Sequence, residues 1–310
     1  MITAVVLSPA IDKIYFIDNF RSGGLFRVNS VVKSAGGKGI NVARVSSILG
    51  EKVKAIGFKA GDSGEWLESK LTDIGVQTRF IHVDGESRTN NNIVDRSRNM
   101  ETEILESGPN IQEEKIEEFL NMFDEEIKNT NVLVCSGRLP EGIPVDFYRK
   151  LIERAKSSGA KVILDSSSEM LKEGIKAKPF MVKPNLRELS SYAGRKLNNL
   201  SEIIEVCKEI ISSGVEVVVA SLGKQGALMV RSNKILFAKT PEVEEVNTIG
   251  SGDCMVAGIA SGLERELSLE EAFRLGVACA VANTQFVEIG FVTQELVDRF
   301  LKEVCIERVR

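Results

Sequence analysis

The 310-residue sequence predicts an α/β fold built on a mostly parallel central sheet. Short β-branched runs alternate with helical patterns along most of the chain, which implies strand-helix-strand units with right-handed crossovers. The runs 132–135 and 215–219 are almost entirely apolar, as is typical of interior strands covered on both faces. Two segments, 11–33 and 84–106, break this alternation. We therefore expect one domain over residues 1–310, with a small antiparallel β lid formed by these excursions.

The strands of the central sheet are expected where short β-branched runs lie between helical patterns. They are predicted at 2–7, 53–58, 76–80, 132–135, 161–165, 180–182 and 215–219. Helices are predicted at 39–49, 64–73, 111–127, 144–158, 185–192 and 200–212. The C-terminal third is expected to be mainly helical, with helices at 251–263, 269–284 and 293–304.

The two excursions contain paired strand-like runs with polar alternation. In the first, the run 13–16 is followed by a turn at 22–24 and a second run at 27–32, and the other excursion has its turn at 84–86. Such strands could cover a site or pair with another subunit. The alternative is that they are ordinary surface hairpins with no such role, and the sequence alone barely distinguishes these two interpretations.

Composition argues against several classes of function. The net charge is -4 and the pI about 5.5, so the charge gives no indication of a nucleic-acid-binding protein. No apolar run approaches the roughly 20 residues that span a bilayer, and the N-terminus reads as a core strand, so a cytoplasmic location is expected. The single histidine, His82, lies in a strand-like run, which leaves little material for a His-ligated zinc site or a Ser-His-Asp triad. The five scattered cysteines lack C-x-x-C spacing and are expected to be small buried hydrophobes.

A glycine turn, NTIGSGD at residues 247–253, precedes the predicted helix 251–263. Its glycines leave backbone N–H groups free to close on a phosphate, and the helix adds the positive end of its dipole. The carboxylate of Asp253 would repel that phosphate unless it is needed as a base for a hydroxyl that attacks phosphorus. The alternative is a tight turn in which Asp253 caps the helix, and the motif alone does not decide between them.

A second glycine cluster, AGGKGINVAR at residues 35–44, opens the predicted helix 39–49. Consecutive glycines let the backbone approach a ligand closely, while Lys38 and Asn41 offer hydrogen bonds. The cluster is not a Walker A loop, because G-x-x-x-x-G-K-[ST] fails at several positions. No G-x-G-x-x-G follows a strand, which weakens the hypothesis of a dinucleotide oxidoreductase.

Together and in this order, the two glycine motifs resemble the two signatures of the ribokinase-like (phosphofructokinase-B) sugar kinases. Further stretches that look like this family are PAID at 9–12, SG and LP within 136–140, DSS at 165–167, KPNLREL at 183–189 and SLGKQGA at 221–227. The resemblance implies a three-layer α/β/α ribokinase-like fold and ATP-dependent phosphorylation of a sugar. Within the family, the chain is most similar to the 1-phosphofructokinases, with the tagatose-6-phosphate kinases close behind.

The resemblance also implies a role for each matching residue. Asp253 would be the catalytic base, and the amides of Gly250, Ser251 and Gly252 would form the anion hole for the transferred phosphoryl group. Arg88 would meet the phosphate already on the sugar, because a guanidinium fork fits phosphate oxygens. The implied substrate-binding residues are Asp12, Gly36, Gly37, Asn41, Arg88 and Ser136, with Lys38 and Arg27 as further phosphate candidates.

ATP and Mg²⁺ are the cofactors that the resemblance implies. The nucleotide-binding residues would be Lys183, Asn185, Ser221, Gly223, Gly226 and Asn283. Glu188, from the family's N-x-x-E motif, would hold Mg²⁺ directly or through a water. Without the resemblance, Glu188 would be a solvated helix residue and Lys183 a residue placed only by the proline after it. K⁺ near the anion hole is a family-level cofactor that the sequence does not settle.

The chain departs from the family's pattern at four positions. Ser251 replaces the commoner alanine, and Asn247 stands where many relatives have aspartate. Ser8 stands where phosphofructokinase relatives have asparagine. Arg138 stands where a serine is normal, and it is either an extra phosphate contact or a surface substitution. The changes at Ser8 and Arg138 leave the exact sugar open but not the reaction.

The leading hypothesis is ATP-dependent phosphorylation of D-fructose 1-phosphate to fructose 1,6-bisphosphate. A tagatose-6-phosphate kinase is the close alternative. A non-catalytic sugar-phosphate sensor is the alternative of another class, although the intact turn at Gly250–Asp253 argues against it because a sensor needs no base. The expected partners are a small-molecule sugar phosphate and, through the β lid, a second copy in a homodimer, with neither nucleic acid nor membrane.

Overall fold

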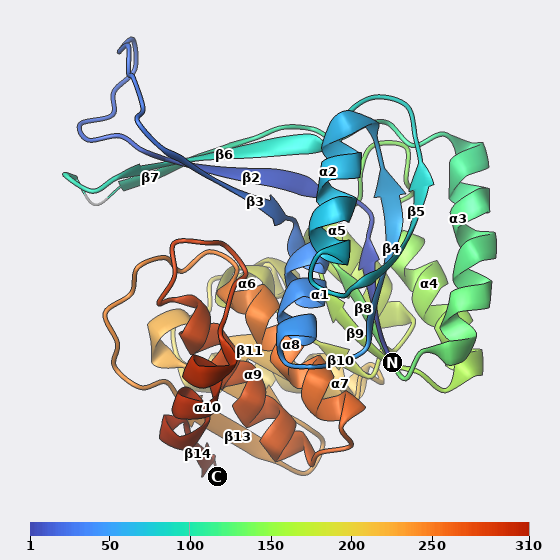
Figure 1. The fold of residues 1–310 in the computed structure, drawn as a ribbon. Coiled ribbons are helices and arrows are strands. Elements are labelled where there is room, and N and C mark those ends of the chain that lie inside the picture. Colours follow the sequence, from blue (N-terminus) through green and yellow to red (C-terminus); the bar gives the residue numbers. More distant parts are fainter. Residues whose placement is uncertain (99, 310) are drawn as a thin grey trace.

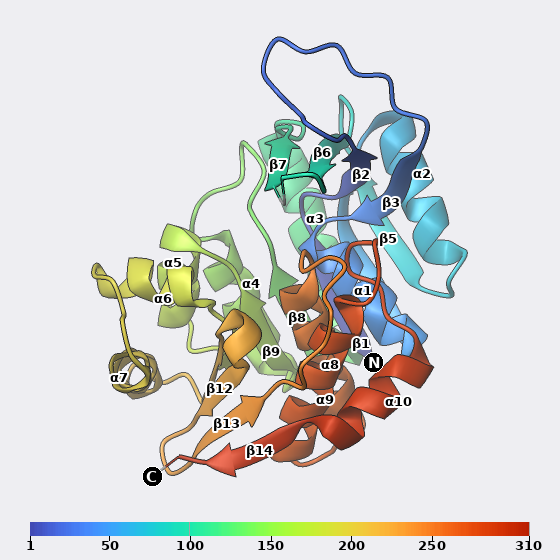
Figure 2. The same ribbon diagram turned by 90° about the vertical axis from the view of Figure 1, so that its left-hand side faces the viewer.

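A large sheet between two layers of helices forms the body of the protein (Figures 1 and 2). The computed structural model describes residues 1–98 and 100–309, and over these the sheet has ten strands in the order β14-β13-β12-β11-β10-β9-β8-β1-β4-β5. The strands are β1 (Ile2–Val6), β4 (Val53–Lys59), β5 (Gln77–His82), β8 (Val132–Ser136), β9 (Lys161–Asp165), β10 (Met181–Val182), β11 (Val217–Ser221), β12 (Ala227–Val230), β13 (Ile235–Lys239) and β14 (Cys305–Arg308). Neighbours from β5 to β11 pair in parallel, and β12, β13 and β14 extend the sheet in antiparallel.

Helices cover both faces of this sheet, as Figure 2 shows. One face carries α1 (Lys38–Ile48), α2 (Gly61–Thr72), α8 (Ser251–Glu264), α9 (Leu269–Asn283) and α10 (Gln294–Glu303). The other carries α3 (Glu113–Glu126), α4 (Phe147–Ala155), α5 (Ser168–Lys176), α6 (Leu186–Ala193) and α7 (Leu200–Ser212). The strands between them are apolar on both faces: β1 and β8 are buried at every position. No helix in the described ranges has the length and apolar character that crossing a bilayer requires.

Helices α8 and α9 pack unusually closely because glycines face each other across their contact. A Cβ built on Gly258 would lie 2.7 Å from the Cα of Gly276, and one built on Gly262 would lie 2.6 Å from the Cα of Ala272. Any larger side chain there would force the helices apart. The close contact fixes the position of the N-terminus of α8, where the turn at 247–253 lies.

A smaller sheet, which we call the lid, projects from the body (Figure 1). Its strands are β3 (Val31–Gly36), β2 (Ala10–Phe16), β6 (Arg88–Asp95) and β7 (Met100–Leu105), in that order. The pairs β2–β3 and β6–β7 are antiparallel, and β2 pairs with β6 in parallel. Successive side chains of a strand alternate between faces, so Asp12, Arg88 and Asn90 share the face that turns toward the body.

The predicted fold class and the parallel strands are confirmed, with strand ends within a few residues of the expected positions. The prediction of a mainly helical C-terminal third was incomplete, because β12, β13 and β14 form an antiparallel edge there. Helix α5 was also missed. The lid run expected at 27–32 is wrong by several residues, since β3 spans Val31–Gly36 and residues 17–30 connect it to β2 as a long loop.

Candidate active site

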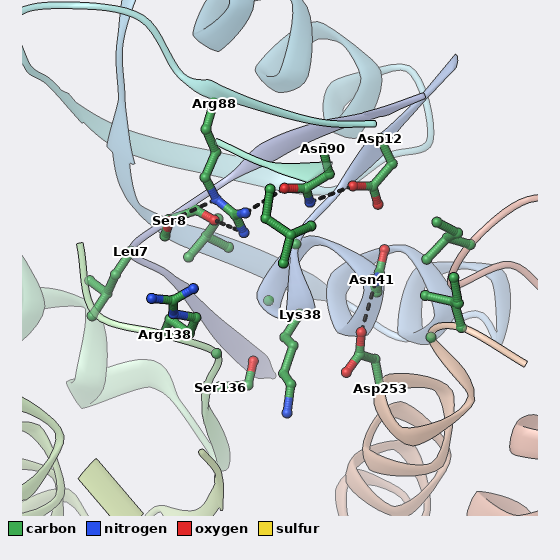
Figure 3. Close-up of a pocket in the computed structure, with 18 of the residues that line it drawn as sticks. Leu7, Ser8, Asp12, Lys38, Asn41, Arg88, Asn90, Ser136, Arg138 and Asp253 are labelled. Atoms are coloured by element: carbon green, nitrogen blue, oxygen red, sulfur yellow. Dashed lines mark hydrogen bonds between the residues drawn. The ribbon is translucent and has the colours of Figure 1, made fainter. Parts of the chain in front are cut away.

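A cavity of about 390 Å³ opens at the carboxyl ends of β1, β8 and β9, between the body and the lid (Figure 3). Ligands bind parallel sheets at this edge because the loops that leave the strands converge there with helix N-termini. The sequence-predicted residues that line the cavity are Asp12, Gly37, Lys38, Asn41, Arg88, Ser136, Glu188, Gly250 and Asp253.

The two glycine motifs, far apart in the sequence, meet in this cavity. The side-chain amide of Asn41, in the first turn of α1, donates a hydrogen bond of 2.8 Å to Oδ2 of Asp253, in the first turn of α8. Helices α1 and α8 lie side by side against the same face of the sheet. The first requirement of the sequence-based hypothesis, that both motifs face one site, is therefore met.

The turn at 249–252 has the geometry of an anion site. Gly250 is the N-cap of α8 with φ 83°, a left-handed conformation that favours glycine. A Cβ on Gly250 would lie 2.6 Å from the backbone N of Gly290, so a side chain is also excluded by contact. No side chain caps this helix end, and the positive end of the helix dipole lies at the cavity, which Gly250 lines. The backbone N–H of Ser251 donates to the backbone O of Thr248 at 3.3 Å in this structure.

Asn283 supports this turn from beneath. It has no exposed surface, and its Nδ2 donates to the backbone O of Ile249 at 2.9 Å and to Oγ of Ser251 at 3.1 Å. Its Oδ1 accepts from the backbone N of Phe291 at 3.1 Å. Because both ends of the amide are used inside the protein, Asn283 holds the turn in place in this structure. Its expected contact with the nucleotide stays a prediction.

The carboxylate of Asp253 is almost completely buried, with 7% of the residue exposed. Burial raises its pKa from the ordinary 3.8 to about 6, and the nearby carboxylate of Asp165 adds to the rise. The positive charges of Lys38 and Lys183 and the hydrogen bond from Asn41 oppose it. The result is a carboxylate that is ionised at neutral pH and more basic than an exposed aspartate.

Two lysines share one buried carboxylate next to the turn. Asp165, at the end of β9, accepts from Nζ of Lys38 at 3.0 Å and lies 3.5 Å from Nζ of Lys183. Burial would raise the pKa of Asp165, but the two lysines outweigh it and the pKa is lowered. A Cβ on Gly252 would lie 3.3 Å from Nζ of Lys183, so this ammonium group stands beside the anion turn. The cluster places two positive charges where a transferred phosphoryl group would be.

A chain of polar side chains continues from the lid. Nδ2 of Asn90 donates to Oδ1 of Asp12 at 2.7 Å, and Oδ1 of Asn90 accepts from Arg88 at 2.6 Å. Arg88 also donates from Nε to Oγ of Ser8 at 3.0 Å. Burial raises the pKa of Asp12. Gly36 lies directly behind Asp12, since a Cβ there would be 1.9 Å from its Oδ2, so this glycine makes room for the carboxylate.

The N-x-x-E motif forms a helix cap at the edge of the cavity. Oδ1 of Asn185 accepts from the backbone N of Glu188 at 2.9 Å, and Oε2 of Glu188 accepts from the backbone N of Asn185 at 2.8 Å. This capping box opens α6. Ser221 bridges to Asn185 from the end of β11, and Gly223 follows in a short 3₁₀ turn. Glu188 therefore both caps the helix and lines the cavity.

The expected site residues that do not themselves line this cavity are Gly36, Ser251, Gly252, Lys183, Asn185, Ser221, Gly223, Arg27, Gly226 and Asn283. Arg27 is exposed on the loop between β2 and β3 and does not line the cavity. Gly226, at φ 107°, packs against β13, where a Cβ would lie 2.0 Å from the backbone O of Ala238, so its contact is structural. Asn283 is buried as described above.

Asn90 and Asn92 line the cavity beside Arg88 and were not among the predicted site residues. The signal was present, because residues 88, 90 and 92 alternate along one strand and must share a face. Asp165 was noted only as part of a matching stretch, and its part in holding two lysines required the fold to bring β9 and α1 together.

A family model described as pfkB family carbohydrate kinase matches residues 2–291. The chain belongs to this family. It is similar to a 1-phosphofructokinase of Bacillus subtilis, with 37% identity over 309 residues and coverage of 100% of both proteins. It is also similar to a tagatose-6-phosphate kinase of Staphylococcus epidermidis, with 36% identity over 312 residues and the same full coverage.

Solved structures of the family give the same fold. The structure of phosphofructokinase-2 from Escherichia coli in complex with potassium superposes with a TM-score of 0.89 at 30% identity, over 98% of each chain. The tetrameric inhibited form of the same enzyme superposes with a TM-score of 0.88. The protein is thus a pfkB-type carbohydrate kinase with the ribokinase-like fold, an ATP-dependent phosphotransferase that uses an alcohol acceptor.

Proposed function

We propose that the protein transfers the terminal phosphoryl group of ATP to a hydroxyl of D-fructose 1-phosphate, giving fructose 1,6-bisphosphate. One observation carries the proposal: Asp253 and the anion turn face the same cavity as Arg88, which lies at the cavity's other end (Figure 3). A sugar that bears one phosphate can place it at Arg88 and its free hydroxyl at Asp253. The B. subtilis relative named 1-phosphofructokinase supports this acceptor.

Asp253 would take the proton of the attacking hydroxyl. Its pKa of about 6 leaves it ionised at neutral pH yet basic enough for this step. Oδ2 is engaged by Asn41, so the other oxygen is the one to accept the proton. A general base of this kind contributes roughly 10²–10⁴-fold to the rate.

The anion turn would hold the charge that develops on the transferred phosphoryl group. The amides of Gly250, Ser251 and Gly252 start α8, and Lys183 stands beside them. Such preorganised donors act in a site that excludes water, and losing one costs about 3 kcal/mol of transition-state stabilisation. Lys38 would add a second positive charge, held there by Asp165.

The acceptor's hydroxyls would bind the polar groups between the two ends of the cavity. Asp12, Asn41 and the backbone at Gly37 line this stretch, and Gly36 makes room for Asp12. Oγ of Ser136 is buried with no hydrogen-bond partner within the described chain, so it is available to a ligand. The exposed position of Arg27 supports no contact with an acceptor in the same chain.

The nucleotide would lie along the edge formed by the ends of β10 and β11. Lys183, Asn185, Ser221 and Gly223 border this edge. Mg²⁺ keeps several waters and uses one or two carboxylates together with substrate phosphates. The Glu188 carboxylate, which lines the cavity, fits that requirement. When bound, Mg²⁺ would neutralise charge on the phosphate oxygens.

We propose two further properties. A monovalent cation beside the anion turn is supported by the potassium complex of the E. coli relative, and higher activity in K⁺ than in Na⁺ salts would support it. A homodimer through the lid is supported by apolar side chains on its outward face, where Val31, Met100 and Ile104 are 44%, 57% and 53% exposed. In this proposal, residues 1–310 form one domain, and the lid is an extension of that domain. A concentration-independent monomer mass in light scattering would refute the dimer.

A tagatose-6-phosphate kinase is the second candidate, because the S. epidermidis relative is 36% identical over its full length. A coupled ADP-release assay with fructose 1-phosphate, fructose 6-phosphate, tagatose 6-phosphate and ribose decides between them. We expect the highest kcat/KM with fructose 1-phosphate. A higher value with tagatose 6-phosphate would establish the alternative, and sugar-phosphate binding without ADP formation across the panel would establish a sensor.

A further inference from the structure

Arg138 is a positively charged side chain of the cavity that the proposed reaction has not used. It lies on the loop after β8, it is exposed, and it lines the cavity. Among the described residues, none accepts a hydrogen bond from its guanidinium group or forms an ion pair with it. Figure 3 shows this group near Ser8, at the end of the cavity away from Asp253.

The guanidinium group of Arg88 faces the same end. Its hydrogen bonds go to neutral acceptors, Oγ of Ser8 and Oδ1 of Asn90, and it forms no ion pair in the described part of the chain. Burial lowers the pKa of Arg88. The carboxylates of Asp12 and Glu106 oppose this fall, and the positive charge of Arg138 adds to it. Two cationic groups that repel each other, neither of them in an ion pair with a described carboxylate, favour the binding of an anion between them.

The chemistry of that anion follows from the rest of the cavity. The opposite end carries Asp253, the proposed base for a hydroxyl group, and the middle offers partners for further hydroxyl groups. The anion is therefore one end of a polyol. Planar guanidinium forks match the oxygens of a phosphate group and can each donate two hydrogen bonds.

The two arginines come from different parts of the fold. Arg88 begins lid strand β6, whereas Arg138 belongs to the body. A phosphate held by both would neutralise their repulsion and join the lid to the body.

We propose that Arg138 is a second phosphate-binding residue that clamps the acceptor's existing phosphate against Arg88, between body and lid. The inference rests on the proposed function and deepens it, because it assigns the preference for a phosphorylated sugar to a residue of the body as well as one of the lid. Inorganic phosphate binds the same clamp.

The test compares Arg138→Ser and Arg138→Lys with the control Arg299→Ser, an exposed arginine of α10 paired with Glu303. For fructose 1-phosphate, we expect Arg138→Ser to raise KM roughly ten- to hundredfold, the effect of losing charged hydrogen bonds, while kcat stays nearly constant. Arg138→Lys keeps the charge without the fork and recovers part of the affinity. Calorimetry should show weaker binding of inorganic phosphate to Arg138→Ser, and the control should match the parent in both measurements.

An unchanged KM in Arg138→Ser, or a fall in kcat without a rise in KM, would overturn the clamp. Because Arg138 is exposed, its substitution should leave the melting temperature unchanged, and Arg138→Lys provides a folded comparison in any case. If the parent phosphorylates no sugar phosphate, the proposed function fails while the calorimetric comparison still decides the clamp. If the parent is active and both variants behave like it, only the clamp fails.

Discussion

Replacing Asp253 by asparagine should remove catalysis and stabilise the protein at the same time. The amide keeps the shape of the carboxyl group and can still accept the hydrogen bond from Asn41. It cannot take a proton, so kcat should fall at least about a hundredfold, the usual contribution of a general base. The parent enzyme should lose activity as the pH falls through about 6, where Asp253 becomes protonated.

The stabilisation follows from the same pKa. Burial raises the pKa of Asp253 from 3.8 to about 6, so the folded state binds this proton more tightly than the unfolded state does. The ionisation of Asp253 therefore lowers the free energy of unfolding. The full penalty is present above pH 6, and it is absent below pH 3.8, where the side chain is protonated in both states. At about 1.4 kcal/mol per pKa unit, the penalty at neutral pH is about 3 kcal/mol. Asp253→Asn should recover most of it.

Denaturant unfolding of the ligand-free protein at pH 7.5 and pH 4 is the decisive measurement, with initial rates recorded on the same samples. We expect Asp253→Asn to be more stable by up to about 3 kcal/mol at the higher pH and equal to the parent at the lower one. Asp298→Asn, the same change at an exposed position of α10, should change neither stability nor kcat.

Two results would refute this reasoning. A variant that retains more than about a tenth of the parent's kcat would show that Asp253 is not the base. A variant no more stable than the parent at pH 7.5 would show that the ionised carboxylate is not destabilised by its burial.

Other substitutions test the surroundings of the base. Gly250→Ala should abolish activity and lower the melting temperature, because its Cβ would lie 2.6 Å from the backbone of Gly290. Gly252→Ala should remain folded, because its Cβ would meet only the end of a lysine side chain at 3.3 Å. Equal melting temperatures of the two variants would contradict this prediction. Asn283→Ala should destabilise the protein by about 1–3 kcal/mol in denaturant unfolding, since it removes the partners of the partly buried backbone O of Ile249 and N of Phe291; a stability equal to the parent's would mean that the turn does not need it. Asp165→Asn should lower kcat more than tenfold in the ADP-release assay by releasing two lysines, and full activity would remove this residue from the site.

The parallel core was predictable because buried strands carry a strong local signal. The run 132–135 is apolar at every position, and the structure buries all of β8. The antiparallel edge was not predictable in the same way: β14 is a short strand of largely exposed residues, and its pairing with β13 joins segments 66 or more residues apart. Short edge strands depend on their partners more than on their own composition.

The site was predictable at its two glycine turns, because each requires residues that few other structures need. The order of the motifs along the chain, read through the family resemblance, assigned both turns to one site, and the structure joins them through the hydrogen bond between Asn41 and Asp253. The support of the turn by Asn283 could not be anticipated, since an asparagine within an apolar helix carries no sign of which backbone groups it will reach. The capping box of Asn185 and Glu188 was visible as N-x-x-E, a motif to which the resemblance gave only a metal-binding role.

The order in which the catalytic parts appear along the chain has a consequence for synthesis. The polar groups proposed to hold the sugar phosphate lie within residues 8–138, whereas the base and its turn come after residue 247, and Asn41 is joined to Asp253 across 212 residues. A chain synthesised only as far as β9 would already contain the residues proposed to bind the sugar phosphate. It would lack the base and the anion turn that phosphoryl transfer needs. A chain that ends before residue 247 should therefore show no kinase activity.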